Sequence, residues 1–315
     1  MRMRLRKPEV FEDIGYTPHR GQLLVHQSKA RFRTLACGTR WGKSTCAAME
    51  AVAALLEPRE RSVGWLVAPT YDVCRRIYER LCMVVTQHLR HRVVTISPRE
   101  QKIVITNLGG GTSELHCKSA DHPVSLLGEA LDFVIVDEAA QLRDEVWQEH
   151  LAPRLIDREG WALVISTPQG PGWFFEMYRR GRRNRDPECE SWASPSRDNP
   201  HVSAAVIESE RGRMPAEKFR QQYEAEFLDV PLDPCEQCGG PQEDVEGRLI
   251  SPEGEYNHAP PTCPACGMFV DAEGKCIVKK VNEWYASFDV EQPWSDPTAV
   301  LCYRWHSIKA DGQWK

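Results

Sequence analysis

The chain has 315 residues, 41% of them hydrophobic and 27% charged, so it can form one large domain or two domains with a substantial core. Its formal net charge of −5 excludes a globally basic nucleic-acid-binding protein, and any DNA contact must come from local patches. The sequence has no apolar run of 18 residues and no apolar segment after its basic start, so we expect neither a membrane span nor a secretory signal.

Two groups of basic residues are the possible DNA contacts. A disordered tail and a solvated helix end explain them equally well, because charge runs are usually exposed to water. The first group is Arg2, Arg4, Arg6 and Lys7, and the second is Arg179, Arg180, Arg182, Arg183 and Arg185.

Residues 17–26 are predicted to form a turn and the start of a helix. Gln22 lies in this segment, ahead of the strand described next. Its amide both donates and accepts hydrogen bonds, so it could bind the edge of an adenine base. An ordinary glutamine on a helix surface is the alternative.

Residues 34–45 carry the strongest signal in the chain. A short apolar strand is followed by a turn ending in Gly-Lys-Ser and by a segment with helical spacing of apolar residues. This arrangement directs backbone N–H groups and the positive end of a helix dipole at phosphate. Lys43 would reach the β- and γ-phosphates and Ser44 would hold Mg²⁺. The predicted nucleotide-binding residues here are Gly38, Thr39, Arg40, Trp41, Gly42, Lys43, Ser44 and Thr45.

A buried parallel strand is expected at residues 63–68, followed by an amphipathic helix that begins near Tyr71. Residues 93–96, 102–106 and 113–116 resemble short strands, with a glycine turn at 109–111. We expect these three strands to form an antiparallel extension of the sheet.

Two acids, Asp137 and Glu138, follow the apolar run at residues 131–136. Neighbouring side chains at a strand end point in different directions, so Asp137 could meet the Mg²⁺ shell while Glu138 faces an attacking water. Phosphoryl transfer needs both roles. The alternative is a capping or turn role for the pair.

The next apolar run, residues 161–165, leads into Ser166, Thr167 and Pro168. A strand end beside the phosphate loop could sense the γ-phosphate and couple its loss to the following segment. A simple transition from strand to turn would give the same sequence.

These motifs, in this order, resemble the ATPase motifs of the large terminase subunit, the DNA-packaging motor of tailed bacteriophages. The motifs are Gly-Thr-Arg-Trp-Gly-Lys-Ser, Ala-Pro-Thr-Tyr-Asp, Leu-Leu-Gly-x-x-Leu-Asp, Val-Asp-Glu-Ala and Ile-Ser-Thr-Pro. The similarity extends over residues 15–230 and includes the helical segment 219–227. It implies that Gln22 belongs to an adenine-binding motif, and that residues 166–168 couple hydrolysis to DNA movement.

The chain departs from that family at three positions. Cys37 stands where the usual spacing places the first glycine of the loop, and Gly38 follows it. Many relatives have arginine at the positions of Thr39 and Leu127. Arginine at such places can stabilise the charge of the transition state. Arg40 is the proposed substitute, and Arg143 and Arg154 are alternatives without motif support.

Residues 231–282 differ in composition and contain two Cys-x-x-Cys-Gly motifs. This spacing is typical of a tetrahedral zinc site with four thiolates, and zinc would then stabilise a segment with little core. Two disulfides or a redox pair are the competing interpretations, and His258 and Cys276 are less favoured ligands. The predicted ligands are Cys235, Cys238, Cys263 and Cys266.

Residues 283–315 resemble the first strands of a ribonuclease-H-like nuclease domain, which follows the ATPase in terminases. Asp289 matches the first metal-binding aspartate of such a domain. Cleavage needs several carboxylates that gather two metals, so we expect no competent nuclease from this chain alone. A surface aspartate on a strand is the alternative.

We therefore predict an α/β P-loop ATPase with a mostly parallel sheet (1–230), a zinc ribbon (231–282) and an incomplete nuclease domain (283–315). The resemblance implies a ring that moves double-stranded DNA in the host cytoplasm, docked on a procapsid, with a portal protein and a small terminase subunit as partners. A helicase-like or remodelling ATPase and a non-catalytic zinc-ribbon adaptor with an inactive loop are the alternative functions.

Overall fold

The computed structural model describes residues 5–182, 186–228, 249–250 and 256–257. The chain divides into two units, residues 1–230 and 231–315. In the second unit the described part is a short antiparallel pair, β9 (Leu249–Ile250) and β10 (Tyr256–Asn257). The four predicted zinc ligands and Asp289 lie outside the described residues.

The first unit is built on one eight-stranded sheet, in the order β3-β4-β5-β2-β6-β7-β1-β8. β4 runs antiparallel to both β3 and β5, and every other neighbouring pair in this sheet is parallel. The predicted α/β fold with a mostly parallel sheet is confirmed. The strands are β1 (Phe32–Cys37), β2 (Arg61–Ala68), β3 (Val93–Ser97), β4 (Lys102–Thr106), β5 (Thr112–Ser119), β6 (Phe133–Val136), β7 (Trp161–Ser166) and β8 (Cys189–Ser194).

The three strands predicted at 93–116 do form an antiparallel meander, β3-β4-β5, but this meander joins the rest of the sheet in parallel, through β5. β5 is twice as long as predicted and pairs in parallel with β2 over all eight residues, from Arg61 opposite Thr112 to Ala68 opposite Ser119. The side chains of β5 are alternately buried and more exposed, a pattern that is typical of antiparallel sheets. The pattern therefore did not indicate that β5 pairs in parallel with β2.

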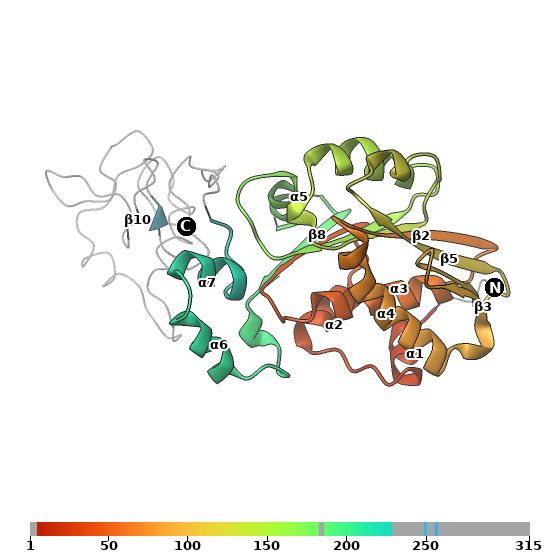
Figure 1. The fold of residues 1–315 in the computed structure, drawn as a ribbon, viewed down its shortest axis with the longest axis horizontal. Helices are drawn as coiled ribbons and strands as arrows, with labels where there is room; N and C mark the ends of the chain where they lie inside the picture. Colours follow the sequence, from red (N-terminus) through yellow and green to blue (C-terminus); the bar gives the residue numbers. More distant parts are fainter. Residues whose placement is uncertain (1–4, 183–185, 229–248, 251–255, 258–315) are drawn as a thin grey trace, which may run out of the picture. The chain divides into compact units, whose positions relative to one another are not determined.

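Helices cover both faces of the sheet (Figure 1). Helices α1 to α4 lie on one face, and α5 and the π-helical turn η4 pack on the other. The helices are α1 (Lys7–Asp13), α2 (Arg20–Gln27), α3 (Lys43–Leu56), α4 (Tyr71–His88), α5 (Trp173–Arg182), α6 (Ala204–Arg211) and α7 (Ala216–Tyr223). Short helical turns are η1 (Arg90–Arg92), η2 (Pro123–Leu126), η3 (Ala139–Gln141), η4 (Val146–Leu151), η5 (Ala152–Leu155) and η6 (Ser196–Asp198).

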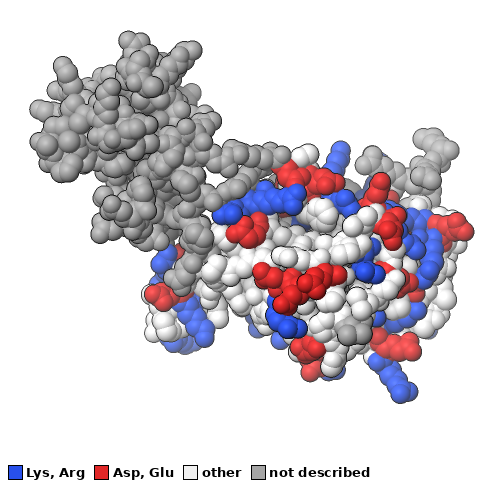
Figure 2. Space-filling model, turned by 90° about the horizontal axis from the view of Figure 1, so that it is seen from above, with Lys and Arg blue, Asp and Glu red and all other residues white. Residues whose placement is uncertain are grey.

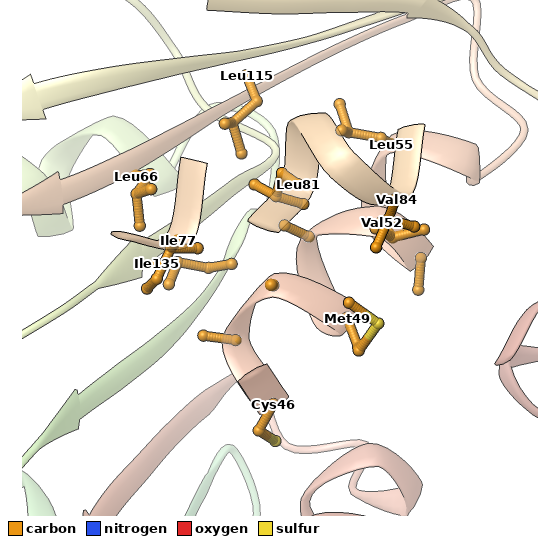
Figure 3. Packing of buried hydrophobic residues seen from close by; sticks show 14 of the residues in the cluster. Cys46, Met49, Val52, Leu55, Leu66, Ile77, Leu81, Val84, Leu115 and Ile135 are labelled. Carbon is orange, nitrogen blue, oxygen red and sulfur yellow. The ribbon is translucent and has the colours of Figure 1, made fainter. Parts of the chain in front are cut away.

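Helix α3 is buried over most of its surface, because it lies between the sheet, α4 and the α1–α2 pair. Its alanines allow this close packing, while Met49, Val52 and Leu55 fill the space toward α4 (Figure 3). They belong to the same buried cluster as Leu81 and Val84 of α4. The helix that begins at the phosphate loop is therefore fixed on every side by packing.

The opposite face of the sheet has a second, aromatic core. Trp173 of α5 stacks on Trp147 of η4, with ring centroids 5.6 Å apart. Phe227, near the end of the described part of the first unit, packs against Phe174 and Phe175 of α5. None of the described helices is both long and apolar enough to cross a membrane.

Candidate nucleotide-binding site

The carboxyl ends of β1, β6 and β7 meet at one edge of the sheet, where ligands of open α/β sheets bind. The loop between β1 and α3 occupies this edge. Gly42 has φ of +103°, and a Cβ there would lie 2.8 Å from Nε2 of Gln22, so only glycine fits. The first helical bond of α3 runs from Cys46 N–H to Gly42 O (3.0 Å). The N–H groups of residues 43–45 precede it and have no acceptor within the helix, as phosphate binding requires.

Cys37 belongs to β1 and is fully buried, so its backbone needs no glycine. Burial also raises the pKa of its thiol, which makes the side chain a small apolar group. Position 38 is the one that needs glycine, because a Cβ there would lie 2.5 Å from Ser196 Oγ and 2.7 Å from Tyr223 O. The irregular spacing of this loop therefore moves its first glycine by one position.

Residues 38–40 are held by three parts of the chain: the end of β8, residues 196–199 after it, and α7. Gly38 N–H donates to Ser194 O (3.0 Å) and Thr39 N–H donates to Gln222 O (2.6 Å). The Ser196 hydroxyl donates to Thr39 O (2.5 Å), and the Asn199 amide donates to Arg40 O (2.7 Å). Arg40 is held at φ +65°, a conformation that is unfavourable for an arginine without such support.

Trp41 was predicted to bind nucleotide, and its side chain anchors the loop. The ring is 1% exposed and packs edge-on against His19, with centroids 4.6 Å apart. Its indole N–H donates to Ser194 Oγ (2.7 Å). Trp41 can therefore reach phosphate only through its backbone N–H, which donates to Gly38 O (3.2 Å) in this structure.

Lys43 is buried inside its own loop. Its Nζ donates to Cys37 O (2.6 Å), to Gly38 O (3.0 Å) and to Thr167 Oγ1 (3.1 Å). Burial lowers the pKa of Lys43, while the carboxylates of Glu138 and Asp137 act in the opposite direction. The predicted phosphate-binding lysine and the predicted coupling residue Thr167 are thus in direct contact.

Asp137 and Glu138 follow β6 and have different surroundings. Asp137 is 3% exposed and its Oδ1 accepts from the backbone N–H of Glu138 (2.9 Å). Glu138 has φ of +50°, and its half-buried carboxylate accepts from Gln141 Nε2 (3.2 Å). This backbone conformation is strained for a residue other than glycine, and such strained residues are often found at active sites.

Burial raises the pKa of Asp137 to about 7, and the like charge of Glu138 adds to this effect. The N–H bond from Glu138 and the charges of Lys43 and Arg76 oppose it. A buried carboxylate near a second carboxylate is favourable for a divalent cation, because the cation stabilises the charged form. The oxygen donors of Asp137 and Ser44 therefore suit the predicted Mg²⁺.

Ser166 ends β7 and is fully buried, and its hydroxyl has no hydrogen-bond partner among the described residues. Thr167 follows with the Lys43 contact, and Pro168 begins the turn toward α5. The end of β7 thus lies beside the phosphate loop.

Gln22 lies against the loop and is buried, not on a helix surface. Its Nε2 donates to Gly42 O (3.1 Å), and its Oε1 accepts from His19 N–H (3.2 Å) and Tyr16 OH (3.0 Å). The first of the bonds to Oε1 forms part of the capping box of α2. The structure therefore brings Gln22 into contact with Gly42, as it brings Lys43 into contact with Thr167.

The three arginines considered for stabilising the transition state have different surroundings. Arg40 is exposed and forms no ion pair with any described residue, whereas Arg143 lies 3.7 Å from Glu145 and Arg154 has a buried Nε. Arg76 of α4 was not predicted, yet its charge acts on Asp137. Its signal in the sequence is weak, because an arginine on an exposed helix face is common. No cluster of three metal-ligating side chains occurs in the part of the chain that the structure describes.

Comparison with known proteins identifies the family of this chain. The family model "Terminase large subunit, T4likevirus-type, N-terminal" matches residues 35–250. The large terminase subunit of Thermus phage G20c is 37% identical over 244 residues, which are 69% of this chain and 50% of that protein. This chain belongs to the large terminase subunit family.

A second relative, the large terminase subunit of Escherichia phage T5, is 26% identical over 310 residues, 96% of this chain and 64% of that protein. The terminase chain described here thus spans between half and two thirds of the length of these two relatives.

Solved terminase structures have the same fold. The ATPase domain of the Thermus phage P74-26 large terminase is 36% identical, with a TM-score of 0.66, and the match covers 72% of this chain and 100% of that one. The large terminase of another thermophilic bacteriophage, solved in complex with ADP, is 17% identical with a TM-score of 0.56. That match covers 67% of this chain and 53% of the other, and it supports the fold alone.

Proposed function

We propose that residues 1–230 bind ATP and hydrolyse it to ADP and phosphate, as the motor part of a viral DNA-packaging machine. The observation that supports this most is the convergence of Lys43, Thr167 and Asp137 at one sheet edge. Lys43 Nζ contacts Thr167, and its charge is coupled to Asp137 and Glu138. These are the groups that phosphoryl transfer needs, and they come from three separate strand ends.

Each side chain has a defined role in this proposal. Lys43 exchanges its contacts with loop carbonyls for the β- and γ-phosphates, and the N–H groups of residues 43–45 bind phosphate oxygens. Ser44 and Asp137 hold Mg²⁺, which would neutralise charge on the phosphates. Glu138 orients the attacking water, and Arg40 stabilises the charge that develops on the γ-phosphate. Gln22 binds the adenine edge.

The deciding experiment compares Glu138→Gln with the wild type. The isosteric amide keeps the shape of the site and removes the charge that orients water, so kcat should fall at least about 100-fold while ATP binding stays within about threefold. Asp144→Asn is the matched control, because Asp144 is an exposed acid in the same segment, and its activity should stay close to that of the wild type. Equal turnover by wild type and Glu138→Gln would contradict the ATPase proposal and favour a non-catalytic adaptor.

The substrate of the motor is proposed to be double-stranded DNA, moved by a homo-oligomeric ring in the host cytoplasm. Membership of the terminase family supports this proposal. The proposed partners are a portal protein on the procapsid and a small terminase subunit. A helicase-like ATPase would instead separate DNA strands. A triplex-displacement assay and a strand-separation assay on the same preparation distinguish the two, since a translocating motor displaces the third strand and leaves the duplex intact.

Most of the described residues in the basic groups predicted to contact DNA are paired with acids. Lys7 is bound to Glu50, Arg179 lies 2.7 Å from Glu176, and Arg180 pairs with Asp186. Acidic and basic side chains also alternate on the face shown in Figure 2. DNA contact through α5 therefore requires rearranged ion pairs. Arg2, Arg4, Arg183 and Arg185 lie outside the described residues.

We also propose that residues 231–282 bind one structural zinc ion, on the basis of the two cysteine motifs. Mass spectrometry under native conditions should find one zinc per chain, and Cys263→Ser should lose it. A wild-type chain that carries no zinc would contradict this proposal. Asp289 is proposed as the first ligand of a divalent metal in a nuclease domain that further carboxylates must complete.

A further inference from the structure

A continuous series of hydrogen bonds runs behind the nucleotide loop, from the buried face of α3 to Gly42. Glu50 Oε1 lies 2.7 Å from His26 Nδ1, and His26 Nε2 lies 3.1 Å from the Tyr16 hydroxyl. Tyr16 is 3.0 Å from Gln22 Oε1, and Gln22 Nε2 donates to Gly42 O (3.1 Å). Four side chains thus connect the interior of the domain to the loop.

The inner end of this series has a fixed charge. Glu50 is 1% exposed and also contacts Lys7 Nζ (2.7 Å) and Arg33 (2.5 Å). Burial alone would raise the pKa of Glu50, but the charges of Arg33 and Lys7 and the bond from His26 outweigh it and lower the pKa strongly. Glu50 is therefore a carboxylate that only accepts, so Nδ1 of His26 must carry a hydrogen.

The state of His26 determines what Tyr16 can do. Burial lowers the pKa of His26, so the ring is neutral near pH 7 with its hydrogen on Nδ1, and Nε2 is an acceptor. Tyr16 has one O–H hydrogen and two acceptors at nearly equal distance, His26 Nε2 at 3.1 Å and Gln22 Oε1 at 3.0 Å. It can donate to only one of them at a time.

Gln22 cannot bind a base while both acceptor sites of its oxygen are occupied. His19 N–H takes one site (3.2 Å) and Tyr16 takes the other. An adenine edge presents an amino donor beside a ring-nitrogen acceptor, so the amide must free its oxygen and turn. If Tyr16 then donates to His26, its buried hydroxyl keeps a partner and the loss of a hydrogen bond is avoided.

We propose that Tyr16 is a positioning residue for adenine recognition. It fixes the Gln22 amide in the empty site and transfers its hydrogen bond to His26 when Gln22 binds the base, and Glu50 keeps His26 ready to accept. Its ring stays in place through edge-on contacts with Phe11 (5.1 Å) and His26 (5.7 Å). This inference rests on the proposed binding of ATP at the loop.

The first test is calorimetric binding of MgADP and MgGDP to the 315-residue chain and its Tyr16→Phe variant. The variant retains the ring but has no hydroxyl to hold Gln22 in the empty site or to donate to His26 in the filled one, so the ratio of ADP to GDP affinity should change about 3- to 10-fold, while GDP affinity stays within about twofold. Tyr78→Phe is the matched control, because its hydroxyl donates to Ser97 O (3.0 Å) on another part of the fold. It should bind both nucleotides as the wild type does.

The outcomes separate the two proposals. A wild type that binds neither nucleotide contradicts the proposed function, and the role of Tyr16 falls with it. A wild type that binds ADP beside a Tyr16→Phe variant with an unchanged ratio of ADP to GDP affinity overturns the role of Tyr16 alone. Equal weakening of ADP and GDP would also overturn it, since that indicates general damage to the loop.

The second test follows the transfer of the hydrogen bond itself. The ¹⁵N resonance of His26 Nε2 should move upfield when ADP binds, because that nitrogen accepts a hydrogen bond more fully. The same resonance should not respond in Tyr16→Phe. An ADP-saturated wild type with an unmoved Nε2 resonance would refute the transfer.

Discussion

Lys43 Nζ lies 3.1 Å from Thr167 Oγ1, so the cation of the nucleotide loop touches the residue that follows β7. The two residues are far apart in sequence and meet because β1 and β7 are neighbouring parallel strands. All three donors of the ammonium are occupied, two by loop carbonyls and one by Thr167. In the proposed function, a phosphate that binds Lys43 would compete with Thr167, and nucleotide occupancy would then change the contacts at the end of β7.

The proposed competition predicts different effects of two variants on MgATP affinity. Lys43→Ala should weaken MgATP binding about 10- to 100-fold, because a charged hydrogen-bond donor to phosphate is lost. Thr167→Val, which keeps the shape, should leave the affinity within about threefold. Calorimetry with a non-hydrolysable ATP analogue measures both. A loss in Thr167→Val as large as that in Lys43→Ala would mean that Thr167 binds the nucleotide directly.

The raised pKa of Asp137 predicts a pH-dependent cost in stability. Burial and Glu138 bring its pKa to about 7 in the folded chain, from 3.8. The folded state thus holds this proton more tightly than the unfolded state, so stability present below pH 4 is lost as the pH rises through 7. In EDTA, Asp137→Asn should therefore raise the Tm more at pH 8 than at pH 5.

Thermal melts at the two pH values check this expectation. Asp144→Asn is the matched control, because Asp144 is exposed, and it should change the Tm little at either pH. An equal gain from Asp137→Asn at pH 5 and pH 8 would show that Asp137 titrates normally.

Asn199 supports the strained backbone of Arg40 through a single N–H bond of 2.7 Å. Asn199→Asp removes that donor and retains the oxygen that accepts from His201 N–H (3.0 Å). We expect MgATP affinity to fall about 3- to 10-fold, because the loop no longer holds its conformation before binding. Asn199→Ala should lower the affinity at least as much. Wild-type affinity in the aspartate variant would show that the Arg40 conformation needs no support from this bond.

Gly64 of β2 leaves room for the ring of Phe133 in the adjacent β6. A Cβ at position 64 would lie 2.0 Å from Phe133 Cζ, so Gly64→Ala should lower the free energy of unfolding by about 1–3 kcal/mol. Gly212→Ala is the matched control, because no atom lies within 4 Å of its Cβ position and its φ is −79°.

Urea titration of the two variants and of Gly64→Ala/Phe133→Leu measures the effect. The double variant should be destabilised by less than the sum of its single changes, since the smaller side chain relieves the clash. Additive losses would place the cost of Gly64→Ala elsewhere.

The strands that carry chemistry could be predicted because their signals are local. Residues 131–136 and 161–166 are apolar runs of strand length followed by polar residues, and β6 and β7 do lie there, buried in the parallel sheet. The α/β fold and the meeting of Lys43 with Thr167 follow from such runs, since parallel strands present their carboxyl ends at one edge. The parallel pairing of β5 with β2 could not be predicted, because it depends on contacts between distant segments that no local pattern encodes.

The sequence by itself determined the nucleotide loop, the acid pair and the family, because each rests on residue types at short spacing. Only the tertiary structure decided how these residues are held. Ser196 and Asn199 contact the loop from more than 150 residues away, and Tyr16 reaches Gln22 through a turn. The pKa of Asp137 likewise depends on burial by the surrounding fold. Such contacts and environments arise from packing between distant segments, which leaves no periodic trace in the chain.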